Sequence, residues 1–393
     1  MAGYRMPFFR SRSLPAAFAL ALVVLTADRV ITQRIISAND GKVTLVDGVN
    51  SPVRTPVPDT VTIIDLSTLP GRIVGEIKVP TSVVGPPQSI AFSPDDAIAI
   101  VTASTKIDPA DPTKTAPDDV VTVIDVKAAP PVVLATLHTG AGANGVSFNP
   151  AGTLALVANR NDGSVSVLSV SGHSVQVTAK VQIGPPESLP SHVVFTADGR
   201  QALVTRNGDS LISLLAVDGG TVTYTKRDIA AGLKPYAIEI TPAGDLALVA
   251  NIGAGASGGA DTVSIIDLKM TPPRTIDNVT VGPIPEGLSI SPDGRYVAVT
   301  VMNGSNVSPS SPFYNDFGTL RVFSIANRTL TPVADAKIGH WCQGAAWGTN
   351  QIVVAQCMIE KEILTFKFDG RTLAPAGSIK INGGPAGIRR SHR

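Results

Sequence analysis

The sequence predicts an all-β chain built from one unit of short strands that recurs along its whole length. Each unit is an apolar stretch, a tight turn and a second apolar stretch, followed by a β-rich run such as VTVIDV or VSIIDL. No segment shows a sustained apolar period of 3.6 residues, which argues against helices. A repeat of roughly 45–55 residues made only of short strands is typical of a β-propeller blade. The clear copies of the unit are residues 90–102, 146–158, 193–205, 238–250 and 288–300.

Two fainter copies, at residues 35–47 and 345–356, bring the number of units to seven. We name the strands of a blade A to D from the axis outward: the two halves of the unit are A and B, and the β-rich run is C. Strand D is a weaker run such as residues 72–79 or 180–184. The A-to-B turns carry Pro-Asp, Ala-Gly or Asp-Gly pairs, which favour tight reversals. The sequence therefore predicts a seven-bladed β-propeller with four antiparallel strands per blade.

The way in which the ring closes stays open at this point. Residues 383–388, GGPAGI, look like the start of an additional strand A. This segment either caps the propeller, or it replaces residues 33–37 and closes the ring with a C-terminal strand. In both cases residues 28–393 form a single domain, since blades add end to end.

The N-terminus resembles a secretory signal. Arg5, Arg10 and Arg12 precede an apolar run from Leu14 to Ala27. A basic start, a short apolar core and small residues near a cut are typical of such a signal, and a run of about 14 residues is short for a membrane span. We expect residues 1–27 to be a signal peptide and the mature chain to be periplasmic or secreted. A retained membrane anchor is the alternative.

Composition and motifs exclude several functions. The net charge is +1 and aromatic residues make up 5% of the chain, so neither phosphate attraction nor base stacking supports nucleic-acid binding. GAGANG at residues 140–145 leads into a strand and not a helix, which argues against a phosphate cradle. No zinc, calcium, haem or quinone motif is present, so we expect no metal and no cofactor. We also expect a monomer without a transmembrane segment in the mature chain.

The two cysteines, Cys342 and Cys357, fall opposite each other if Thr349-Asn350 is the tip of a hairpin. Cross-strand partners have Cβ atoms roughly 4.5–5.5 Å apart, close to the separation that a disulfide needs. An exported protein could keep this disulfide oxidised. Two buried free thiols are the alternative.

One face of the propeller is predicted to be the functional face. In antiparallel blades the D-to-A and B-to-C connections share a face, and the long insertions at residues 104–119, 252–261 and 302–317 are all B-to-C loops. Long loops on a rigid scaffold usually carry binding sites.

A polar column lies at the start of each strand A and would circle the channel mouth on this face. Its members are Gln33, Gln88, Asn144, Ser191, Tyr236, Glu286 and Gln343. The column could be a hydrated entrance or a ligand site. For a ligand site, the predicted binding residues are Gln88, Asn144, Arg160, Tyr236, His340 and Gln343.

His192 begins strand A in the fourth blade, where most other blades have a small residue. Strand-B ends bring Arg206 near it, and Glu286 lies on the same ring. A histidine beside arginine and a carboxylate can act as a general acid or base because its usual pKa is near neutrality. His192, Arg206 and Glu286 are therefore the predicted catalytic residues. The alternative is a histidine that only hydrogen-bonds within a packed mouth.

The segments FNPAGTLALVANRNDGSVSVLSV (148–170) and ITPAGDLALVAN (240–251) resemble the YVTN-repeat β-propeller family. The resemblance covers nearly the whole mature chain and implies an exported or surface bacterial protein that binds a partner. The chain is also similar to propeller lactonases resembling 6-phosphogluconolactonase, whose strands A begin with Pro-Arg-His. Only Pro190-Ser191-His192 approaches this motif, with Ser191 in place of Arg.

Two functions therefore stand side by side. The first is an exported binding module that engages a protein, peptide or small molecule on the face with the D-to-A and long B-to-C loops. The second is a lactonase-type hydrolase with its site at the channel mouth, which requires His192.

Overall fold

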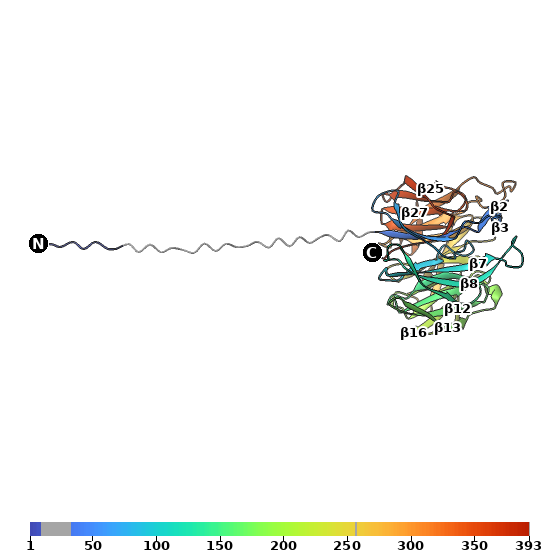
Figure 1. The fold of residues 1–393 in the computed structure, drawn as a ribbon, viewed down its shortest axis with the longest axis horizontal. Coiled ribbons are helices and arrows are strands. Elements are labelled where there is room, and N and C mark those ends of the chain that lie inside the picture. Colours follow the sequence, from blue (N-terminus) through green and yellow to red (C-terminus); the bar gives the residue numbers. More distant parts are fainter. Residues whose placement is uncertain (9–32, 256–257, 393) are drawn as a thin grey trace. The chain divides into compact units, whose positions relative to one another are not determined.

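A computed structural model describes residues 1–8, 33–255 and 258–392 of the protein. The predicted signal peptide, residues 1–27, falls largely outside these described ranges. Residues 34–390 form seven four-stranded antiparallel sheets and one small hairpin (Figure 1). The inner strand of each sheet contacts the inner strands of two neighbouring sheets, and these contacts close a ring. The predicted seven-bladed β-propeller with four strands per blade is confirmed.

Six blades follow the chain in order, and each uses four consecutive strands. The first two are β6 (Ile90–Phe92), β7 (Ile98–Ile107), β8 (Thr115–Asp125) and β9 (Val132–His138), then β10 (Ala143–Phe148), β11 (Leu154–Asn159), β12 (Ser164–Ser171) and β13 (Ser174–Gln182). The next two are β14 (Pro190–Phe195), β15 (Gln201–Arg206), β16 (Leu211–Asp218) and β17 (Thr221–Ala230), then β18 (Pro235–Ile240), β19 (Leu246–Asn251), β20 (Asp261–Asp267) and β21 (Arg274–Gly282). The last two are β22 (Pro285–Ile290), β23 (Tyr296–Val301), β24 (Gly318–Ala326) and β25 (Thr329–Ile338), then β26 (Gly344–Thr349), β27 (Ile352–Cys357), β28 (Glu362–Phe368) and β29 (Leu373–Lys380). A short 3₁₀ helix, η1 (Pro186–Ser188), precedes β14.

The seventh blade joins the two ends of the propeller. Its order from the axis outward is β30 (Gly384–Arg390), β1 (Arg34–Asp40), β4 (Thr60–Asp65) and β5 (Arg72–Lys78). Of the two ways of closure left open by the sequence, the C-terminal strand is the one adopted, and β30 pairs antiparallel with β1.

This closure corrects the assignment of residues 35–47 as an A–B pair. β1 is the second strand of its blade, and the residues after it form a separate hairpin of β2 (Val43–Val46) and β3 (Val49–Pro52). Gln33 is therefore not in the polar column. Its place belongs to Ala386, which precedes Gly387 and Ile388 as Gln343 precedes Gly344 and Ala345.

The A-to-B turns repeat one local arrangement, which explains the repeated phrase. In the first of them Ser93 donates a hydrogen bond of 2.6 Å to Asp95, and the N–H of Ile98 donates to the Ser93 hydroxyl at 3.1 Å. Side chains that bond to their own backbone in this way favour tight turns. The equivalent pair Ser291 and Asp293 makes the same 2.6 Å bond.

The core lies between neighbouring blades. The apolar residue two positions after the polar column is fully buried in most blades, as at Val146, Val193 and Ile238. Val193 packs with Leu156 of the preceding blade. Burying such a side chain contributes about 1.5–3 kcal/mol, so the blades are held together mainly by apolar side chains.

Cys342 and Cys357 form a disulfide with an S–S distance of 2.00 Å. It joins the connection before β26 to the end of β27. In the described part of the chain, no helix has the length and apolar character needed to cross a membrane.

Candidate functional site

The side chains of Pro87 and His192 fill space beside the inner strands of neighbouring blades. A Cβ atom added at Gly287 or Gly344 would lie 2.8 or 2.7 Å from side-chain atoms of Pro87. One added at Gly145 would lie 2.6 Å from the ring of His192. Small residues are therefore required in this layer, because Pro87 and His192 occupy the space.

The predicted polar column lies on the face that carries the D-to-A and B-to-C connections. This column is buried. Gln88, Asn144, Ser191 and Gln343 are at most 2% exposed, and Glu286 is 9% exposed. The N–H₂ group of Gln343 donates at 3.1 Å to Glu286 and at 3.1 Å to the carbonyl of Val83. The segment around Val83 covers the ring, so the ring is not the hydrated entrance that the sequence left open.

Arg160 and His340 occupy different places on this face. The guanidinium of Arg160 donates to Ser191 at 2.6 Å and to Asn207 at 3.2 Å, and it lies 5.7 Å from the ring centre of Tyr236. His340 Nδ1 lies 2.6 Å from a carboxylate oxygen of Glu360, and its Nε2 lies 3.5 Å from the hydroxyl of Tyr314. Arg160 thus joins the polar column, whereas His340 has its own partner.

Burial changes the protonation of the ring. It raises the pKa of Glu286 from 4.5 to about 8, although the hydrogen bond from Gln343 and the charge of Arg160 act in the opposite direction. Burial also raises the pKa of Tyr236. Near neutral pH both side chains are therefore mostly uncharged.

The predicted catalytic residues lie in three separate settings. His192 is wholly buried near the axis. Arg206 forms ion pairs with Asp209 and with Asp228, the latter at 3.2 Å. Glu286 bonds to Gln343 in the covered ring. No hydrogen bond or ion pair among the described residues joins any two of His192, Arg206 and Glu286.

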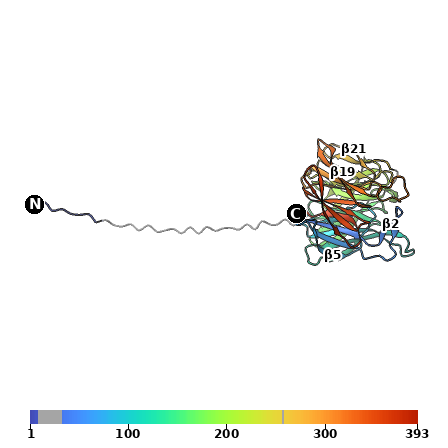
Figure 2. The same ribbon diagram turned by 90° about the horizontal axis from the view of Figure 1, so that it is seen from above.

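A cavity of about 570 Å³ opens between the A-to-B turns. This is the face opposite to the predicted one. The C-terminus lies at this end of the propeller, and the β2–β3 hairpin lies at the other end, in both Figure 1 and Figure 2. The lining residues include Asn149, Thr196, Glu239, Thr241, Ser289, Arg389 and Arg390.

An ion pair between Glu239 and Arg389 lies at the inner end of this cavity. The second carboxylate oxygen of Glu239 accepts the N–H of Ile290 at 2.8 Å, which fixes the carboxylate. The side chains of Arg389 and Glu239 are 21% and 16% exposed. The pair therefore faces the cavity while it is held from behind.

His192 lies behind Arg389. Its Nδ1 accepts the N–H of Ile238 at 3.3 Å, and its Nε2 is 3.4 Å from a guanidinium nitrogen of Arg389. Burial and the positive charge of Arg389 hold the pKa of His192 well below its usual range, so the ring is neutral. A neutral imidazole has one acceptor nitrogen, which here faces Ile238. Nε2 then carries the ring proton, and the backbone of Val146 is a further hydrogen-bonding neighbour of the ring.

The sequence did contain a signal for part of this cavity. The position three residues after the polar column is Ala91, Ser147, Val194, Glu239, Ser289, Ala346 and Arg389 in the seven blades. Glu239 is the only acidic residue in this column and could have been singled out. Arg389 could not, because its place depends on closure by β30.

Comparisons with known proteins agree with the fold. A family model described as "Lactonase, 7-bladed beta-propeller" matches residues 114–256. No curated protein matches the sequence.

Similar solved structures include a periplasmic gluconolactonase from Pseudomonas aeruginosa, with 16% identity, a TM-score of 0.67 and coverage of 91% of this chain and 99% of that one. A candidate 6-phosphogluconolactonase from Bacteroides uniformis has 15% identity, a TM-score of 0.70 and coverage of 91% and 99%. At such identities the likeness shows a shared fold.

Proposed function

We propose that the protein hydrolyses lactones in the cavity that opens between the A-to-B turns. The observation that carries the proposal is the Glu239–Arg389 pair at the inner end of a cavity of about 570 Å³. The match of residues 114–256 to a lactonase family model supports the same chemistry. This proposal keeps His192 from the sequence-based prediction, and it uses Arg389 and Glu239 in place of Arg206 and Glu286.

In the proposed reaction Glu239 accepts a proton from water, whose oxygen attacks the lactone carbonyl carbon. Negative charge develops on the carbonyl oxygen, and the guanidinium of Arg389 donates hydrogen bonds to it. The bond between the carbonyl carbon and the ring oxygen then breaks. The ring oxygen takes the proton back from Glu239, and the product is a hydroxy acid.

His192 acts as a positioning residue in this scheme. It is wholly buried and contacts Arg389 from behind, with 3.4 Å between the two nitrogen atoms. The buried ring packs against the guanidinium and limits the positions that it can take, and because the ring is neutral it adds no second positive charge. A shift of the guanidinium by about 1 Å can cost on the order of a hundredfold in rate.

The test is hydrolysis of a panel of five- and six-membered sugar lactones, followed by proton release in weakly buffered solution. We expect Glu239→Gln to lower kcat/KM by roughly 10²–10⁴-fold, the usual contribution of a general base. We expect His192→Gln to lower it by roughly 10–100-fold, the effect of a misplaced partner. Glu187→Gln, an exposed carboxylate outside the cavity, is the matched control and should behave as wild type.

If the wild type hydrolyses no lactone in the panel, or if Glu239→Gln is as active as Glu187→Gln, the proposal is wrong.

A binding function on the face with the long B-to-C loops is the second proposal. The β2–β3 hairpin exposes Val46 by 52% and Val49 by 63%, and the neighbouring insertion exposes Phe313 by 45%. A Cβ atom at Gly48 would lie 2.7 Å from the backbone of Ser308, so the hairpin and this insertion are adjacent. The exposed apolar side chains on these two adjacent segments favour contact with a protein or peptide.

A photo-crosslinking residue at Val49 should give a specific adduct in the extracytoplasmic fraction, where the predicted signal peptide would direct the chain. The same residue at Val177, which is 39% exposed on strand β13, is the control. Identical adduct patterns from both positions would contradict a binding site on the hairpin.

A further inference from the structure

The connection from β5 to β6 covers the polar ring on the face with the long loops. We call residues 82–86 the cover segment. Val83 is 1% exposed and accepts a hydrogen bond from Gln343 on its carbonyl. Beyond the cover segment, Gln88 reaches across the channel and donates to the carbonyl of Leu288 at 3.3 Å.

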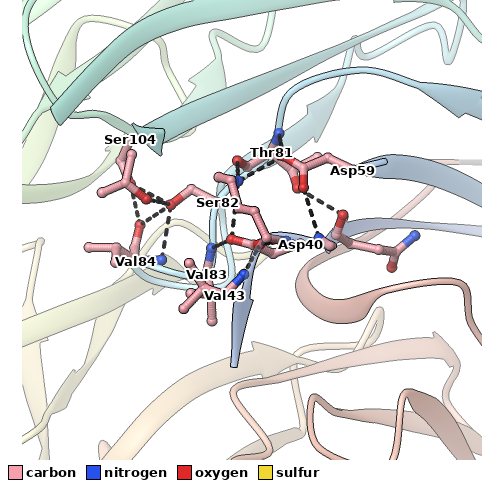
Figure 3. A network of polar contacts seen from close by, with 12 residues as sticks. Asp40, Val43, Asp59, Thr81, Ser82, Val83, Val84 and Ser104 are labelled. Carbon is pink, nitrogen blue, oxygen red and sulfur yellow. Dashed lines mark hydrogen bonds and ion pairs between the residues drawn. The ribbon is translucent and has the colours of Figure 1, made fainter. Parts of the chain in front are cut away.

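Polar anchors outside the ring hold the cover segment (Figure 3). The carboxylate of Asp40 accepts the N–H of Val83 at 2.8 Å, and that of Asp59 accepts the N–H of Thr81 at 3.0 Å. Lys42 lies 3.2 Å from Asp40 and 2.7 Å from Asp59. On the other side, Ser104 donates to the hydroxyl of Ser82 at 3.0 Å and to the carbonyl of Val84.

An apolar collar adds to this closed state. Val83 packs in one cluster with Val43, Trp341 and Met358. Exposing a buried Val side chain to water is unfavourable. Without a ligand, the anchors and the collar together keep the cover segment in place.

The polar ring beneath the cover segment destabilises the closed state, because several of its buried polar atoms have no partner. Both side-chain polar atoms of Asn144, and the side-chain oxygens of Gln88 and Gln343, are buried without a hydrogen-bond partner among the described residues. A buried polar group without a partner destabilises the state that buries it. These three side chains are at most 2% exposed.

Gly85 is the residue that permits so close a cover. Its φ is +123°, and a Cβ atom there would lie 1.8 Å from the side-chain oxygen of Asn144. Any other residue would push the segment away from the ring. The cover is thus shaped to the ring, and it accepts one hydrogen bond from Gln343, but it leaves the amide of Asn144 and the side-chain oxygens of Gln88 and Gln343 without partners.

We propose that this ring is a binding site for a hydroxyl-rich small molecule, a polyol or a sugar, and that residues 82–86 are its movable cover. A hydroxyl group both donates and accepts, which matches amides that have unused oxygens and an unused N–H₂ group. Tyr236 and Glu286 add a phenol and a carboxyl group to the same ring. The site is on the face opposite to the Glu239–Arg389 cavity, so it does not depend on lactone hydrolysis.

A cysteine pair tests the movement of the cover. The hydroxyl oxygens of Ser82 and Ser104 are 3.0 Å apart, so Ser82→Cys with Ser104→Cys should lock the cover by a disulfide. Calorimetric titration with D-glucose and, separately, with D-gluconate should show binding to wild type and to each single variant. In the locked form we expect binding weaker by at least ~tenfold, or ~1.4 kcal/mol. Lactone hydrolysis should be the same in the locked form and in wild type.

Hydrogen exchange gives a second readout of the same proposal. A saturating sugar should increase deuterium uptake in the peptide that contains residues 81–88 of wild type, because binding displaces the cover. The locked form should show no increase. Gluconate binding that the locked form weakens would assign the gluconate carboxylate to Arg160, and glucose binding that the locked form weakens would assign the site to neutral sugars; both outcomes support the proposal. Binding that the lock does not weaken belongs to the Glu239–Arg389 cavity and contradicts the proposal.

Asn144→Ala separates binding from folding. Since the Asn144 amide has no partner in the closed form, its removal should leave stability unchanged or raise it, while sugar binding is lost. Asn251→Ala is the matched control, because the side-chain N–H₂ group of the buried Asn251 donates to the hydroxyls of Thr262 and Ser264, and Asn251 lies in neither the ring nor the cavity lining. This control should lose stability and keep binding. The proposal is overturned if Asn144→Ala binds sugar as wild type does, or if wild type neither binds a probe nor changes its exchange.

Discussion

At the scale of single residues, Glu286 links burial to a measurable pH dependence. Its carboxyl group is 9% exposed, and burial raises its pKa from 4.5 to about 8. Between these two values the folded protein holds a proton that the unfolded chain releases. Stability from this group is therefore fully present below about pH 4.5 and is lost as pH rises toward 8. Burial raises the pKa of Asp40 as well, in the same direction.

We predict that the free energy of unfolding of wild type falls between pH 5 and pH 8, and that Glu286→Gln reduces this fall by on the order of a few kcal/mol. Denaturant unfolding of both proteins at pH 5, 6.5 and 8 measures this fall in the free energy of unfolding. Glu187→Gln, which replaces an exposed carboxyl, should leave the fall unchanged. Parallel curves for wild type and Glu286→Gln would contradict the prediction.

The residue pattern of the sequence predicted the polar column around the axis. It did not predict the accessible cavity on the opposite face. The column that contains Asn144, Tyr236 and Gln343 does form a ring, yet its burial depends on a connection whose path no repeat predicts. Glu239 lies in an equally readable column, but its partner Arg389 comes from a segment about 150 positions away. Pairing across such a separation follows from ring closure, which the local pattern left undecided.

At the scale of elements, the repeated phrase predicted strands A and B well where its turn residues were present. It was wrong at residues 35–47, where β1 is a second strand and β2–β3 is an insertion. The reason is physical: an apolar run followed by Asp and Gly satisfies both a blade turn and a hairpin insertion. The insertion at residues 104–119 likewise continues largely as strand, since β7 and β8 pair as far as Ile107 and Thr115.

The disulfide gives a prediction at this scale. Cys342 and Cys357 are 15 residues apart in sequence, and closing a loop of that length in the unfolded chain is worth about 3 kcal/mol. We predict that Cys342→Ser with Cys357→Ser lowers the free energy of unfolding by about this amount. Denaturant unfolding compares the variant with oxidised and with reduced wild type. Equal stability of all three would show that the disulfide does not constrain the unfolded chain.

At the scale of the whole molecule, the propeller depends on its last strand in two ways. β30 supplies the innermost strand of the seventh blade and contacts β26 and β6 on either side. It also supplies Arg389, which with Glu239 forms the ion pair in the cavity. Closure of the propeller and assembly of the proposed catalytic pair therefore happen together. The unpaired amides of the polar ring under the cover segment belong to other blades.

Deletion of residues 384–393 removes β30, whereas a chain that ends at Arg390 loses only the tail after it. Comparing the two chains separates the loss of β30 from the effect of a shortened tail. Without β30, the inner edge of β1 loses its hydrogen bonds, and an exposed sheet edge promotes association between chains. We predict loss of the cooperative thermal transition, light scattering at micromolar concentration and no lactone hydrolysis. A chain that ends at Arg390 keeps β30 and should retain the transition and the activity. If the longer deletion still unfolds in one transition near the wild-type temperature, six blades close without the seventh inner strand, and the coupling between closure and the cavity fails with it.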